Sequence, residues 1–253
     1  MLTPAKFIGL ANYVQLIHDP LFWKSLVNTC YYTFTTVPLG IVVGLGLALV
    51  LNQRIKAVNF FRTIFYLPSV VSVVALSLVW MWLLNPEIGL VNALLGKLGL
   101  PQPRWLFSET WAMPSLIIMS VWFVGPNMVI YLAALQGVPD YLYDAAEIDG
   151  VGTFEKFRYI TLPMITPAIL LTLIMNIIWS FQVFTQAYVM TNGGPNNATL
   201  TSILYLYRQA FQYFHMGYAS ALAWLVFVVV FGITLILFKS SSIWVFYEAE
   251  IKR

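Results

Sequence analysis

The sequence predicts an all-α membrane protein, on the evidence of its composition and of the spacing of its charged residues. Of the 253 residues, 60% are hydrophobic and only 9% are charged, and the mean hydropathy is +0.80. A soluble domain carries about 25% charged residues, and a disordered chain combines low hydrophobicity with high charge. The composition therefore excludes both classes and indicates a chain that is largely surrounded by lipid.

Long stretches without a charged residue predict five membrane-spanning helices. These stretches are residues 25–53, 63–86, 110–139, 159–207 and 209–238. Each is longer than the roughly 20 residues that a helix needs to cross the hydrocarbon layer. The fourth stretch is too long for one helix, and its second part, TNGGPNNATLT (191–201), is polar and rich in turn residues, which excludes it from lipid. We therefore expect spans near residues 26–51, 64–84, 113–136, 163–189 and 217–238.

The distribution of Lys and Arg predicts the orientation of these spans. Eight basic residues lie in the loops 52–63 and 137–162 or after the last span, against five on the other side. The eight are Arg54, Lys56, Arg62, Lys156, Arg158, Lys239, Lys252 and Arg253; the five are Lys6, Lys24, Lys97, Arg104 and Arg208. Because cytoplasmic loops carry the excess of basic residues, both loops and the tail 241–253 are expected in the cytoplasm.

The transmembrane domain is thus expected over residues 26–240, preceded by an external amphipathic connector over residues 1–25. An odd number of spans places the N-terminus outside, and the first residues lack the apolar core of a signal peptide. This arrangement favours a further helix upstream of the connector. A five-helix protein is the alternative.

The loop 137–162 is the most unusual segment, because it holds five of the ten acidic residues. It reads as two short helices: the first begins after Pro139 and ends at Gly150, and the second begins after Thr153 as its cap and ends before Pro163. One apolar side of the first helix is predicted at Leu142, Ala145, Ala146 and Ile148. A helix that lies on lipid favours a basic polar face, whereas this one is acidic. A protein partner is therefore favoured over a lipid surface.

The same loop carries a recognisable signature. Asp144-Ala145-Ala146, three residues, Gly150, nine residues, and then Ile160-Thr161-Leu162-Pro163 resemble the EAA signature of permease subunits in binding-protein-dependent ABC importers. Every spacing agrees, and Asp144 stands where the signature has Glu, which leaves the contact of that carboxylate open. TNGGPNNAT (191–199), LYLYRQAF (204–211), FFRTIFYLP (60–68) and FIGLANYVQLI (7–17) are similar to the carbohydrate-type permeases, so the resemblance covers nearly the whole chain.

The resemblance implies the helical bundle of a type I ABC importer permease, which normally has six or more spans, in the inner membrane of a bacterial cell. The implied partners are a second permease subunit, two copies of a cytoplasmic ABC ATPase and an extracytoplasmic solute-binding protein. The implied cargo is a sugar or related carbohydrate, with glycerol phosphates and oligosaccharides both left open. The loop becomes the coupling helix that sits in a groove of the ATPase. The coupling residues are then Asp144, Ala145, Ala146, Glu147, Asp149, Gly150, Ile160, Leu162 and Pro163.

Catalytic sites and other ligand classes find no support in the residues. The Gly96-Lys97 pair is followed by Leu98 and lacks the other residues of a phosphate-binding loop. The lone Cys30 cannot form a disulfide within the chain, and no Cys/His metal cluster is possible. A net charge of +3 is too weak for a nucleic-acid binder. We therefore expect a transporter subunit without a cofactor of its own, with ATP and Mg²⁺ on the partner ATPase.

Substrate contacts are expected from polar residues within the spans, none of which holds a charged residue. Amide groups both donate and accept hydrogen bonds, and aromatic rings cover the apolar faces of sugars. Hydrogen bonding between helices explains the same residues equally well, and a proline kink beside Gly125-Pro126 explains Asn127. The candidates are Asn176, Trp179, Ser180, Gln182 and Gln186 in the span 163–189, and Asn127 in the preceding span.

A channel or facilitator that needs no ATPase is the alternative function. The acidic loop discriminates between the two classes, because a facilitator has no use for a helix pair that protrudes into the cytoplasm.

Overall fold

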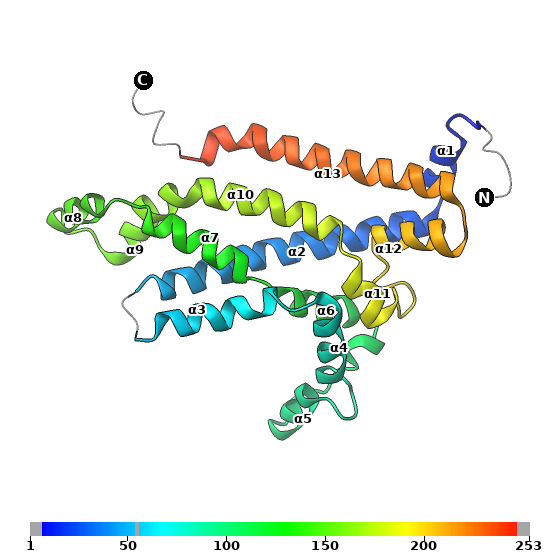
Figure 1. Cartoon of the computed structure of the whole chain (residues 1–253), viewed down its shortest axis with the longest axis horizontal. Coiled ribbons are helices and arrows are strands. Elements are labelled where there is room, and N and C mark those ends of the chain that lie inside the picture. The colour runs from blue at the N-terminus through cyan, green and yellow to red at the C-terminus, as the bar shows by residue number, and fades with distance from the viewer. Residues whose placement is uncertain (1–6, 54–55, 247–253) are drawn as a thin grey trace. The chain divides into compact units, whose positions relative to one another are not determined.

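The computed structural model describes residues 7–53 and 56–246, and all regular structure within them is helical (Figure 1). The α-helices are α1 (Ala11–Ile17), α2 (Pro20–Leu51), α3 (Val58–Tyr66), α4 (Val73–Leu83), α5 (Leu90–Lys97), α6 (Ala112–Val121), α7 (Gly125–Gln136), α8 (Asp140–Ile148), α9 (Thr153–Lys156), α10 (Leu162–Phe181), α11 (Thr185–Thr191), α12 (Ser202–Tyr207) and α13 (Met216–Trp244). Two short 3₁₀-helices, η1 (Leu67–Ser69) and η2 (Trp105–Phe107), and two π-helices, η3 (Phe157–Thr161) and η4 (Arg208–Gln212), complete the set.

Among the described residues, three helices are long and apolar enough to cross a membrane unbroken. They are α2, the continuous run Thr153–Phe181 and α13. α2 begins at Pro20, earlier than the expected residue 26, because Asp19 accepts a hydrogen bond from the Leu21 N–H (2.9 Å) and so caps the helix. α13 continues past the expected end at residue 238 to Trp244. Lys6, Arg54, Lys252 and Arg253, which contributed to the predicted orientation, lie outside the described residues.

The other two expected spans are each made of two helices rather than one. The span expected at 64–84 is interrupted after η1, which contains Pro68, and resumes at α4. The span expected at 113–136 bends by 42° between α6 and α7. Pro126, at the start of α7, cannot donate a backbone hydrogen bond to the preceding turn. With each pair counted as one span, the total is five.

The chain forms two compact units. Unit 1 comprises residues 1–33, 73–116 and 179–232, and unit 2 comprises residues 34–72, 117–178 and 233–253. The acidic loop between α7 and α10 belongs entirely to unit 2.

The core of unit 2 is built where α2, α7 and α10 meet. Its buried residues are Ala48, Leu51, Met128, Tyr131, Leu132, Leu135, Val138 and Ile165. A Cβ at Gly44 would lie 3.1 Å from the Cβ of Asn127, so glycine permits the close approach of α2 and α7. The Tyr131 hydroxyl lies 2.5 Å from the Thr172 hydroxyl and joins α7 to α10.

Unit 1 is organised around the first turns of α2. The carboxylate of Asp19 accepts hydrogen bonds from the hydroxyls of Tyr205, on α12, and Tyr218, on α13. Burial alone would raise the pKa of Asp19, but these hydroxyls and backbone N–H groups outweigh it and hold the pKa below its usual range. One carboxylate thereby holds three helices of unit 1 together.

The polar loop 191–201 satisfies its backbone within unit 1, as its composition requires. Lys24 donates to the carbonyl of Asn196 (2.6 Å), and Asn28 donates to the carbonyls of Asn197 (2.9 Å) and Leu200 (3.1 Å). Arg208 donates to the carbonyl of Asn192 (2.5 Å) from the other end of the loop. These bonds leave few loop carbonyls to be satisfied by solvent or lipid.

Candidate functional site

The acidic loop folds as the sequence predicts at its first turn. α8 begins after Pro139 and is capped at its C-terminus by Asp149. Gly150 has φ +72°, the left-handed conformation that glycine adopts without strain. The N–H of Gly150 donates to the carbonyl of Glu147 (3.1 Å), and the N–H of Val151 donates to that of Ala146 (2.9 Å). This pair of bonds is the Schellman motif, so the predicted role of Gly150 as a helix terminator is confirmed.

The buried face of α8 differs from the predicted one. Leu142 and Tyr143 pack against the core of unit 2, and Ala146 is buried. Ala145 is exposed instead, and Ile148 is 88% exposed. The four residues predicted to form one apolar side towards a partner are therefore divided, with Leu142 and Ala146 packed within this chain and Ala145 and Ile148 left exposed. The backbone turns residues 142, 143 and 146 inward, which leaves Ala145 and Ile148 for another surface.

The second turn of the loop is capped by a different residue from the one expected. The N-cap is Gly152, and Thr153 is already the first residue of α9. The side chain of Glu155 accepts a hydrogen bond of 2.7 Å from the N–H of Gly152, as in a capping box. Glu155 therefore has a local structural role at the start of α9.

The helix does not end before Pro163, contrary to the prediction. α9 passes through η3 into α10 without a break, and Thr153–Phe181 form one helix of 29 residues. The N–H of Leu162 donates to the carbonyl of Phe157, five residues earlier, as in a π-helix. The wider turn accommodates Pro163, the second residue of α10, which has no N–H to donate. The long helix therefore contains Ile160, Leu162 and Pro163 in its interior.

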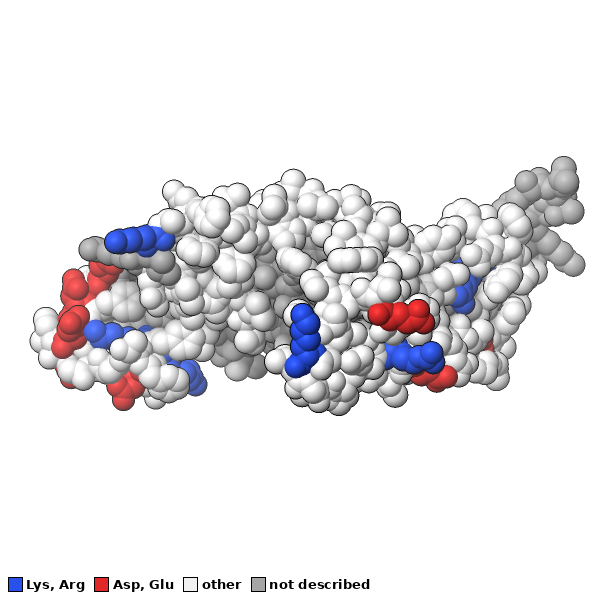
Figure 2. Space-filling model, turned by 90° about the horizontal axis from the view of Figure 1, so that it is seen from below, with Lys and Arg blue, Asp and Glu red and all other residues white. Residues whose placement is uncertain are grey.

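Negative charge dominates the surface of the loop. Figure 2 shows acidic side chains gathered at the end of the molecule where Figure 1 places α8 and α9. Asp144, Glu147 and Asp149 are all exposed. Within residues 7–53 and 56–246, the one ion pair joins Glu147 to Lys156 (3.4 Å). The other carboxylates of α8 are therefore available to a basic partner.

The sequence predicted five of the candidates for substrate contact in one helix, the span 163–189. The structure divides them between two helices and the turn that joins these. Asn176, Trp179 and Ser180 lie in α10, whereas Gln182 lies in the turn after it and Gln186 lies in α11. At the interruption, the carbonyl of Val183 accepts a hydrogen bond from the Thr201 hydroxyl (2.9 Å), so a distant residue satisfies a carbonyl that lies outside both helices.

Exposure separates the same candidates. Trp179 is 72% exposed and Gln182 is exposed, while Ser180 and Gln186 are half-buried. Asn127 lies against Gly40 and Gly44 of α2, which supports a packing role. Asn176 and Asn127 are half-buried as well, so Trp179 and Gln182 are the two exposed candidates.

An aromatic cluster beside these residues was not predicted. The rings of Phe184 and Tyr188 stack at 5.3 Å, and Tyr207 lies 5.1 Å from Phe184 and 5.5 Å from Phe211. Aromatic residues spaced across two helices carry no recognisable sequence pattern, because their proximity depends on how α11 and α12 pack in unit 1.

Comparison with known proteins places these features in a family. Residues 26–244 match the family described as binding-protein-dependent transport system inner membrane component. The probable ABC transporter permease protein YesP of Bacillus subtilis is 42% identical over 99% of this chain and 82% of its own length. The sulfoquinovosyl glycerol transport system permease protein SmoG of Agrobacterium fabrum is 35% identical over 91% of this chain and 75% of its own.

Solved structures agree with the sequence matches. A chain of the bacterial alginate ABC transporter, solved in complex with its alginate pentasaccharide-bound periplasmic protein, superimposes with a TM-score of 0.85 at 27% identity. The match covers 92% of this chain and 83% of the other. An amino acid ABC transporter has a TM-score of 0.56 at 20% identity and shares the fold alone.

Proposed function

The chain belongs to the family of binding-protein-dependent transport system inner membrane components, and from this premise we propose that α8 is the segment that couples it to an ATPase. The chain is the transmembrane permease subunit of an ATP-driven importer of sugars or related carbohydrates, and a multi-pass protein of the inner membrane. It is a transporter subunit and not an enzyme. Family membership thus decides against the ATPase-independent facilitator.

The exposed face of α8 is the observation that carries the proposal. Asp144, Ala145 and Glu147 are exposed, and the adjacent Ile148 is 88% exposed. A helix as short as α8 is unstable alone in water. The contacts of its inner face with the core of unit 2 stabilise α8, so its outer face is left for a partner. Its outer face combines carboxylates with an aliphatic side chain, which suits a groove with an apolar floor and basic rims.

The full assembly would contain a second permease subunit, two copies of the cytoplasmic ATPase and an external solute-binding protein. ATP and Mg²⁺ would bind to the ATPase, and this chain would contribute Asp144, Ala145, Glu147 and Asp149 to the contact. Gly150 would terminate the coupling helix, and Ile160, Leu162 and Pro163 would carry its movement into α10. Trp179 and Gln182 would line the path of the carbohydrate.

Co-purification of the ATPase with a tagged version of this chain tests the coupling. Ala145→Leu is expected to overpack the groove by about 1–3 kcal/mol, and Asp144→Lys to repel its basic rim. Both variants should lose the ATPase while the chain keeps its thermal stability. Ala146→Leu should instead destabilise the chain itself, because Ala146 is buried.

Glu109→Lys provides the matched control, since it makes the same change of charge at an exposed residue of the loop predicted to be external. It should retain the ATPase. Full retention of the ATPase by both Ala145→Leu and Asp144→Lys would refute the coupling role of α8.

A further inference from the structure

A hydrogen bond joins α8 to the long helix on the far side of the Gly150–Gly152 turn. The hydroxyl of Tyr143, on α8, lies 2.8 Å from the hydroxyl of Thr161, the last residue of η3. Thr161 is 6% exposed, and Tyr143 packs against the core of unit 2. The hydrogen bond is therefore partly shielded from water. A shielded hydrogen bond is stronger than one that is exposed to water.

A second contact of Thr161, within the π-helix, favours one direction for this hydrogen bond. The Thr161 hydroxyl also donates to the carbonyl of Lys156, at 3.4 Å and five residues earlier. With its proton directed to that carbonyl, the Thr161 hydroxyl accepts a hydrogen bond from the Tyr143 hydroxyl. The resulting chain runs from Tyr143 through Thr161 to the backbone of the helix that becomes α10. Since Thr153–Phe181 are continuous, this backbone belongs to a membrane span.

The other links between α8 and α10 are less able to transmit movement. The Glu147–Lys156 ion pair leaves the Glu147 side chain 79% exposed, and exposed ion pairs contribute little. The connecting turn contains two glycines, Gly150 and Gly152, and glycine is the most flexible residue. The apolar contacts of Leu142 and Ile160 with the core hold the helices together but have no preferred direction. Of these direct links between α8 and the long helix, the Tyr143–Thr161 hydrogen bond combines direction with partial burial.

We propose that Tyr143 and Thr161 form the positioning pair through which a displacement of α8 is transmitted to α10. The proposal rests on the proposed coupling of α8 to the ATPase. Neither residue would contact the carbohydrate or the nucleotide. Their role would be to keep α8 in fixed register with α10, so that nucleotide-driven movement of α8 rotates or shifts the span instead of bending the loop.

The test measures movement of α10 directly in the complex of permease and ATPase subunits. Met175, an exposed residue of α10, is replaced by cysteine in a Cys30→Ser background and labelled with an environment-sensitive fluorophore. ATP with vanadate is the probe for the fluorescence shift, and the rate of ATP hydrolysis is recorded separately with ATP alone. Tyr143→Phe and Thr161→Val each remove one hydroxyl and keep the shape of the side chain.

Each single variant should reduce the ATP-induced shift by about 2- to 10-fold, which corresponds to the loss of one buried hydrogen bond. The ATPase should still co-purify and hydrolyse ATP at the parental rate. The double variant should be no worse than either single variant, because both remove the same bond. Thr161→Ser keeps the hydroxyl and should restore the shift.

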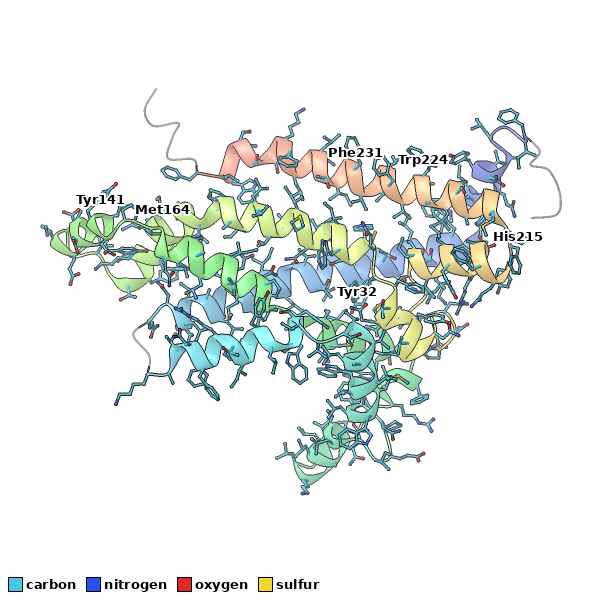
Figure 3. The ribbon with its side chains drawn as sticks, in the orientation of Figure 1. Tyr32, Tyr141, Met164, His215, Trp224 and Phe231 are labelled. Atoms are coloured by element: carbon cyan, nitrogen blue, oxygen red, sulfur yellow. The ribbon has the colours of Figure 1, made fainter. Side chains whose placement is uncertain are left out.

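Tyr141→Phe is the matched control, because Tyr141 lies on the same helix and is 63% exposed (Figure 3). A merely structural role would lower thermal stability and the yield of the complex, while the shift per complex stayed unchanged. The proposal is overturned if Tyr143→Phe and Thr161→Val retain the full shift, or if the parent shows none. Failure of the ATPase to co-purify with the parent would instead refute the proposed coupling by α8.

Discussion

Gly150 is the residue at which local conformation and proposed function are most directly linked. Its φ of +72° is accessible to glycine, and no atom lies within 4 Å of where a Cβ would stand. Any effect of substitution must therefore come from the backbone and not from a clash. Asparagine tolerates this conformation better than other residues, and β-branched residues tolerate it least.

Substitutions of Gly150 should consequently act in an order that follows backbone preference. Gly150→Asn should be mild, Gly150→Ala should cost about 1 kcal/mol and Gly150→Val should cost more, within the roughly 1–3 kcal/mol typical of a strained residue. Membrane levels of the protein should stay normal, while co-purification of the ATPase falls in the same order. Because no atom lies near the position of a Cβ, side-chain size does not enter, and equal co-purification by the Asn and Val variants would show that the turn does not position α8.

At the scale of whole helices, composition does not reveal where a helix is interrupted. The break between α10 and α11 involves no glycine or proline, and the carbonyl of Val183 within it is satisfied by the hydroxyl of the distant Thr201. The break moves Gln182 out of the helix and into a turn, where both its amide and the neighbouring Trp179 are exposed. An aromatic ring beside an exposed amide suits a carbohydrate, because the ring covers apolar C–H groups while the amide pairs with hydroxyls.

Replacement of these two side chains should separate transport from ATP hydrolysis. Trp179→Ala and Gln182→Ala should each lower uptake of the sugar by roughly 2- to 10-fold, the range expected for one aromatic or hydrogen-bonding contact. Basal ATP hydrolysis by the purified complex should be unchanged. Trp224→Ala serves as a control, because Trp224 is an exposed tryptophan of α13 (Figure 3). Loss of assembly, with the remaining complexes transporting normally, would favour a packing role.

Orientation in the membrane is a property of the whole molecule, and the proposed partners require one particular orientation. The ATPase must meet α8 in the cytoplasm, so the loop that contains α5 must face outward. The lone cysteine makes this measurable, since Cys30→Ser leaves a chain without thiols.

A membrane-impermeant maleimide should therefore distinguish two single-cysteine variants in intact cells. Leu98→Cys, at an exposed residue after α5, should be labelled at once. Phe154→Cys, at an exposed residue of α9, should be labelled only after the membrane is permeabilised. The reverse pattern would contradict both the orientation and the proposed site of ATPase contact.

The sequence alone identified the lipid surroundings and the family of this protein, and the five expected spans match the described residues when each bent helix pair is counted as one. Charge-free stretches report directly on burial in lipid, because an unpaired charge in hydrocarbon is costly wherever the neighbouring helices lie. The spacing from Asp144 to Pro163 likewise identified the loop, and the left-handed turn at Gly150 followed from chemistry local to a few residues.

Only the tertiary structure decided which side chains of those segments are available. In the folded chain Ala146 is buried and Ala145 is exposed. The helix continues through Pro163 by means of a π-helix, and it is interrupted at Val183. Each outcome depends on contacts between residues far apart in the chain or on the exact phase of a helix. Hydrophobicity averaged over a segment reports neither contacts between distant residues nor the phase of a helix. Within a membrane span, apolar surroundings on every side also remove the polar face that would reveal the phase.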